Sequence, residues 1–97
     1  MHEAKDRVRR EREQAAARDS HLTALAKRQA GAWRRVEALV ATKRPGDYDA
    51  AVALLKDLRE ISERKGRLVD VIERIGALRD AHAKKPSLLM RLKKAGL

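Results

Sequence analysis

The 97-residue sequence lacks cysteine and phenylalanine, and its only aromatic residues are Trp33 and Tyr48. Because there is no cysteine, disulfide bonds, thiol catalysis and cysteine-ligated zinc are excluded. The chain also lacks the aromatic platforms on which single-strand nucleic-acid binders stack bases. No apolar run approaches the roughly 18–20 residues that span a membrane, and the charged N-terminal stretch does not resemble a secretory signal. These absences predict a cytoplasmic protein without a membrane partner.

Signatures of catalysis are missing as well. His2, His21 and His82 lie far apart in the sequence and do not form a metal-binding spacing such as HExxH. None of the serines lies in a nucleophile elbow, and no glycine-rich loop is present to hold a phosphate. We therefore expect no enzymatic activity, no metal, no cofactor and no small-molecule substrate.

The charge of the chain is strongly positive and unevenly distributed. The formal net charge is +10, from 24 Lys and Arg against 14 Asp and Glu. Residues 1–46 carry a net charge of +6, residues 47–83 carry −1, and residues 84–97 carry +5. Basic segments of this kind attract phosphates or acidic proteins. The two ends are therefore the charged surfaces that a partner would meet.

The first part of the chain reads as one long helix. From His2 to Lys43 there is no proline and a single glycine, Gly31. Apolar residues recur at spacings of three, four and seven, which indicates one face of a helix. Upstream, Glu11 and Arg18 fall on the same face and weaken the apolar stripe. The pattern predicts a helix over 2–43 with a strong second half and a weak first half.

Proline and glycine mark the other boundaries. Pro45 is expected to stop the first helix, Gly46 to allow the turn, and Asp47 to cap a second helix that ends before Gly66. A third helix with a periodic apolar stripe follows over about 67–83.

The end of the chain predicts one more short helix. Pro86 is expected to stop the third helix and Ser87 to cap the fourth. The closing Gly96 and Leu97 resemble a Schellman ending with an apolar residue folded back onto the helix.

The predicted fold is all-α. A long N-terminal helix is followed by two medium helices and a short C-terminal helix, as a small helical bundle or a repeat-like array. Because the two medium helices can cover only the second half of the first helix, residues 1–20 are expected to form a charged helical extension and residues 21–97 the bundle domain. Trp33 and Tyr48 lie on the apolar stripes, which favours core packing over a binding role for both.

Two groups of residues are candidates for binding. The uncovered stripe of the first helix predicts self-association as a homodimer through Leu22, Leu25 and Val36. The basic C-terminal segment predicts contacts with nucleic acid or an acidic partner. Its candidate residues are Lys84, Lys85, Arg91, Lys93 and Lys94.

The segments AWRRVEALVATKRPGDYDAAVALLKDLREI and LRDAHAKKPSLLMRLKKAGL resemble the C-terminal helical region of actinobacterial SWIM-type zinc-finger proteins. The resemblance covers about residues 32–97. The matching positions are Trp33, Lys43, Pro45, Tyr48, Asp49, Leu54, Leu55, His82, Pro86 and Leu92. The CxC…CxH finger that names the family is absent, so its binding activity is not carried over. The resemblance implies a helical accessory module of a larger protein.

Three functions remain open at this point. The first is a non-enzymatic protein-interaction module, part of a larger nucleic-acid-associated protein. The second is a non-specific nucleic-acid binder that uses the basic ends. The third is a self-associating coiled-coil element with residues 1–40 as the dimer seam. Salt-dependent binding to duplex DNA distinguishes the second, and the oligomeric state in solution distinguishes the third.

Overall fold

The computed structural model describes residues 2–97, with side chains from residue 7 onward, and this part of the chain is entirely helical apart from short connections. The predicted all-α class is confirmed, but the number of helices is five rather than four. The helices are α1 (His2–Ala26), α2 (Gln29–Ala41), α3 (Pro45–Arg64), α4 (Leu68–Ala81) and α5 (Pro86–Lys94).

The prediction of one helix over 2–43 is wrong, because the chain turns at Lys27 and Arg28. Arg28 has φ −128° and ψ 32°, outside the helical region. Neither residue of this turn is a proline or a glycine, and we attribute the turn to the packing of α1 and α2 on α3. Since α3 has 20 residues and α2 only 13, α2 alone leaves the end of α3 uncovered. The turn redirects α1 so that Leu22 and Leu25 are buried in the common core.

The preceding helices end before both prolines, as predicted, since α2 ends at Ala41 and α4 at Ala81, but each proline also begins the next helix. Pro45 and Pro86 are the first residues of α3 and α5, where a missing N–H costs nothing because that group has no partner within the helix. The predicted caps Asp47 and Ser87 are therefore wrong, since each lies inside its helix. The left-handed residue before α3 is Lys43, with φ 59°, and not Gly46.

The helix endings at Gly66 and Gly96 confirm the prediction from the sequence. Both glycines have positive φ, 69° and 76°. At the end of α5, the Gly96 N–H donates to the Lys93 carbonyl at 3.0 Å and the Leu97 N–H donates to the Leu92 carbonyl at 2.9 Å. This pair of bonds is the Schellman arrangement. It turns Leu97 back into the core, where it is buried.

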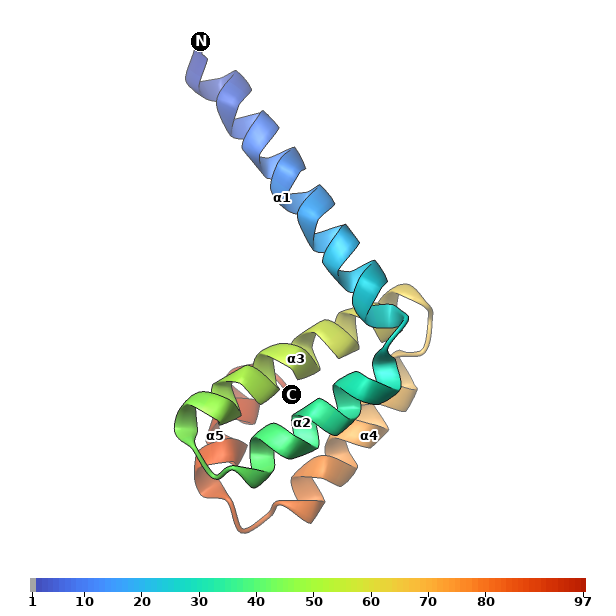
Figure 1. Cartoon of the computed structure of the whole chain (residues 1–97), viewed down its shortest axis with the longest axis vertical. Coiled ribbons are helices and arrows are strands. Elements are labelled where there is room, and N and C mark those ends of the chain that lie inside the picture. The colour runs from blue at the N-terminus through green and yellow to red at the C-terminus, as the bar shows by residue number, and fades with distance from the viewer. Residues whose placement is uncertain (1) are drawn as a thin grey trace.

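Helix α3 lies at the centre of the bundle and contacts each of the other four helices. Its buried residues include Leu55 and Leu58, which are almost completely inaccessible. In the view of Figure 1, α2 lies in front between α3 and α4, and α5 closes the end of the bundle where α3 begins. Every buried residue of the described side chains is hydrophobic, and the described core begins at Leu22.

The first part of α1 forms an arm that projects from the bundle (Figure 1). All side chains from 7 to 21 are exposed, and the described chain extends 54 Å along its longest axis. Among residues 2–97, no helix has the length and apolar character to span a membrane.

Candidate docking groove

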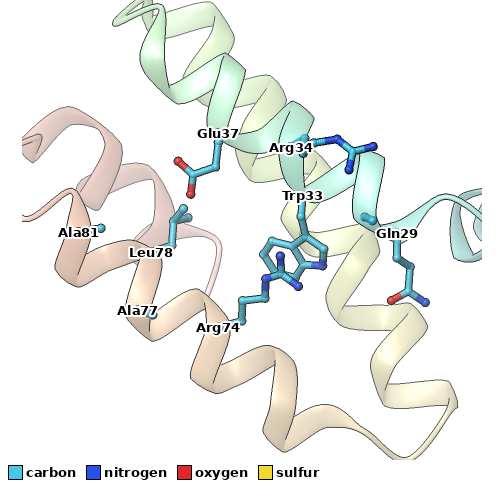
Figure 2. Close-up of a pocket in the computed structure, with 9 residues that line it drawn as sticks. Gln29, Trp33, Arg34, Glu37, Arg74, Ala77, Leu78 and Ala81 are labelled. Carbon is cyan, nitrogen blue, oxygen red and sulfur yellow. The ribbon is translucent and has the colours of Figure 1, made fainter.

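A groove runs between α2 and α4, with a volume of about 630 Å³. Figure 2 shows it from the open side, with α2 and α4 as its walls and α3 behind them. The helices form walls but do not meet over it, because both pack primarily on α3. The residues that line it are Gln29, Ala30, Trp33, Arg34 and Glu37 from α2, and Arg74, Ala77, Leu78 and Ala81 from α4.

Trp33 forms the floor of this groove and belongs to the core at the same time. Its side chain is 9% exposed and packs in the main hydrophobic cluster. The prediction of core packing is therefore confirmed for Trp33, as it is for the buried Tyr48. The sequence did not indicate that the outer edge of the Trp33 indole also faces a groove.

Arg74 covers the indole from the opposite wall. Its Cζ atom lies 4.2 Å from the centroid of the Trp33 ring, which is the geometry of a cation–π contact. Figure 2 shows the Arg74 side chain extending from α4 across the groove to the ring. At an exposed site such a contact contributes about 0.5–1 kcal/mol. Arg74 is therefore a cover that a stronger partner for its guanidinium can displace.

The remaining charged residues lie on the walls of the groove. Glu37 Oε2 is 3.3 Å from His82 Nε2, at the end of α4. Arg34 lies folded back along α2, since its Nη2 atom is 3.7 Å from where a Cβ would stand at Gly31. Among the residues with described side chains, neither Arg34 nor Arg74 has a carboxylate within 4 Å. The groove thus has two cations free to bind a ligand.

The shape of the groove suits a helix. Ala30, Ala77 and Ala81 place small side chains along its walls, and small residues let a neighbouring backbone approach closely. Amphipathic helices bind proteins by placing apolar residues, spaced three or four apart, into grooves of this kind. The described side chains contain no cluster of three or more metal-ligating residues.

The five basic candidates near the C-terminus fall into two groups. Arg91 is engaged within the chain, since its Nε atom donates to Asp49 Oδ1 at 2.7 Å and its Nη1 atom donates to the Ser87 carbonyl. Lys85 Nζ lies 3.5 Å from the Val40 carbonyl. These two residues fasten α5 and its preceding loop to the bundle.

The other three candidates, Lys84, Lys93 and Lys94, are exposed. No hydrogen bond or ion pair of theirs is found among the described side chains. The basic segment therefore combines two structural cations with three lysines that are accessible to a partner.

The three residues expected to pair across a dimer are buried inside the single chain. Leu22, Leu25 and Val36 are 2%, 8% and 0% exposed. The premise that they form an uncovered stripe is wrong, because the turn after α1 places both α1 and α2 against α3. A homodimer therefore stays a prediction that needs a surface other than these residues.

A charge network fixes the direction of α1 on α3. Arg18 Nη2 donates to Asp57 Oδ1 at 3.0 Å and Arg18 Nε donates to Glu60 Oε2 at 3.0 Å. Arg64 Nη1 donates to Asp19 Oδ1 at 2.8 Å. Hydrogen bonds to Glu60 and then Asp57 raise the pKa of the Arg18 guanidinium, and the bond to Asp19 raises the pKa of Arg64. In the sequence, Arg18 interrupts the apolar stripe of the first helix. The structure explains this charged residue, because Arg18 binds two carboxylates of α3.

Comparison with protein families, with curated proteins and with solved structures found no match to this chain. The resemblance to the helical region of SWIM-type zinc-finger proteins therefore stays a prediction that rests on its sequence motifs. Several of these motif residues have structural roles here: Pro45 and Pro86 begin helices, and Leu55 and Leu92 are completely buried.

Proposed function

We propose that this chain is a non-enzymatic protein-interaction module that binds a helix of another protein in the groove between α2 and α4. The observation that carries the proposal is the position of Trp33 at the floor of that groove, under a displaceable arginine. Tryptophan and arginine are the residues that most often dominate binding energy at protein interfaces. The resemblance noted above supports a helical accessory module of a larger protein.

The depth and composition of the groove support a protein partner over a small molecule. The α4 wall provides three apolar side chains, Ala77, Leu78 and Ala81, and the α2 wall adds Ala30 and the indole of Trp33 beside its polar residues. A partner helix would bury the indole edge and the alanine walls together, and burial of apolar surface drives such association.

A library of helical peptides displayed on phage tests this proposal. Peptides are selected for binding to the intact chain and then measured against two variants. Ala77→Phe fills the groove, whereas Ala53→Phe adds the same bulk at an exposed position of α3 outside it. We expect selected peptides to lose binding to Ala77→Phe and to keep binding to Ala53→Phe. Peptides that bind both variants as well as they bind the parent chain would refute the groove as the docking site.

A second candidate function is direct binding to nucleic acid. The observation that favours it is the set of three accessible lysines, Lys84, Lys93 and Lys94. If all three contact phosphates, replacing them with glutamine lowers the slope of log affinity against log salt by about 2.7. The melting temperature should not change, since exposed charges contribute little to stability. Duplex-DNA binding measured across salt concentrations checks this, and an unchanged slope would remove these lysines from the function.

A further inference from the structure

We propose that the helix bound by this groove is acidic as well as amphipathic, with a carboxylate that takes Arg74 away from Trp33. This inference rests on the proposed docking function and specifies the chemistry of the partner. Its starting point is the contact of Arg74 with the indole, 4.2 Å from the ring centroid. The contact covers the floor of the groove and leaves the guanidinium without a carboxylate among the described side chains.

Among the residues with described side chains, some arginines have a side-chain carboxylate partner and others, such as Arg35 and Arg79, have none. Arg18, Arg64 and Arg91 each form ion pairs with carboxylates of another helix. The two arginines that line the groove, Arg34 and Arg74, are left without such a pair. A ligand in the groove would therefore meet two guanidinium groups and one carboxylate, that of Glu37, which contacts His82.

An exchange of partners makes a carboxylate the favourable ligand. A charge-assisted hydrogen bond between a guanidinium and a carboxylate is stronger than a cation–π contact at an exposed site. A partner carboxylate therefore draws Arg74 off the ring, and the uncovered indole becomes available to an apolar side chain of the same helix. The two events reinforce one another, because each needs the groove to be occupied by one helix with both kinds of residue.

Charge and composition favour this occupant over the alternatives. The chain carries a net charge of +10, which opposes a second copy and attracts an acidic protein. Duplex DNA also provides anions, but its backbone would leave the Trp33 floor and the alanine walls without an apolar contact. An acidic amphipathic helix satisfies the cations and the apolar floor together.

Two synthetic peptides test the inference. Each is about 18 residues long, roughly five turns of helix, with leucines at spacings of three and four and no tryptophan. One carries glutamates beside the leucine stripe and the other carries glutamines at the same positions. Because Trp33 is the only tryptophan of the chain, its emission reports directly on the floor of the groove. Affinities are measured on the intact chain, on Arg74→Gln and on Arg35→Gln, an exposed α2 control outside the groove.

The glutamate peptide is expected to shift Trp33 emission to shorter wavelength and to bind at least about fivefold more tightly than the glutamine peptide. Arg74→Gln should remove most of that preference, whereas Arg35→Gln should preserve it. Circular dichroism checks that both variants are folded: Arg35→Gln should melt like the parent chain, and Arg74→Gln slightly lower because it loses the contact with Trp33.

Three other outcomes would overturn the inference. Equal binding of the two peptides at Trp33 would refute the acidic partner and leave the docking function standing. Both proposals would be contradicted if neither peptide binds and if Trp33 emission also fails to respond to the peptides selected by phage display. A Trp33 response to duplex DNA or to a second copy of the chain, with none to the glutamate peptide, would assign the groove to a different ligand.

Discussion

Replacing Leu92 with alanine should destabilise the bundle by about 2–3 kcal/mol. Leu92 is completely buried, and truncation of a buried leucine costs about 2–5 kcal/mol, depending on how much of the cavity collapses. We expect the lower half of this range, because α5 has only nine residues and is free to shift toward α3. The polar contact of Arg91 with Asp49 limits that shift, so the cavity should not close completely.

Thermal unfolding followed by circular dichroism measures the effect. For a domain of this size, a loss of about 2–3 kcal/mol lowers Tm by roughly 10–20 °C. Met90→Ala is the matched control, since Met90 lies on the same helix and is 64% exposed; its Tm should change by an amount equivalent to about 0.5 kcal/mol at most. If Leu92→Ala has the same Tm as Met90→Ala, then α5 is not packed on the bundle as described.

Three further perturbations test separate parts of the fold. Gly96→Ala should lower the free energy of unfolding by about 1–2 kcal/mol, because residue 96 has φ 76°. Gly46→Ala should raise it by about 0.5–1 kcal/mol, because Gly46 is helical and no atom lies within 4 Å of the new Cβ. Urea unfolding that shows both variants changed in the same direction would contradict this. Arg18→Gln should lower Tm slightly, and by the same amount at pH 7 and at pH 10. The raised pKa of Arg18 keeps its guanidinium charged, and its hydrogen bonds intact, throughout that range. If the Tm of the variant equals that of the parent chain at pH 10, the network does not stabilise the fold as described. Leu22→Ala should lower the free energy of unfolding by about 2–5 kcal/mol, whereas Val8→Ala should leave it almost unchanged, because only Leu22 is buried. Equal Tm values for the two variants would place Leu22 in the exposed arm.

The features that the sequence predicts well are those determined by local chemistry. A glycine that adopts positive φ is enough to end a helix, so Gly66 and Gly96 identify the ends of α3 and α5 correctly, and only Gly96 is also followed by an apolar residue. The apolar periodicity of α3 likewise predicts that Leu55 is buried, and that of α5 predicts the buried Leu88 and Leu92, whereas Leu89, expected on the same face, is only partly buried. In these segments the local pattern and the tertiary packing agree.

The features that the sequence does not predict depend on how helices meet. Leu25 and Ala32 are seven residues apart, as are Ala26 and Trp33, so the apolar stripe keeps its phase across the turn that separates α1 from α2. The groove has the same origin, because Arg74 and Trp33 are distant in sequence and come together only when α2 and α4 pack on α3. Spacing within one helix cannot report a contact between two helices.

The central claim is that the α2–α4 groove is the docking surface of this protein, and an NMR titration tests it most directly. The ¹⁵N-labelled chain is titrated with the glutamate peptide, and backbone shifts are mapped onto the sequence. The account predicts that the largest changes fall on residues of the two walls, among them Gln29, Arg34, Ala77 and Ala81, together with the indole N–H of Trp33. Changes confined to α5 or to the exposed arm of α1, with the Trp33 indole unmoved, would contradict it.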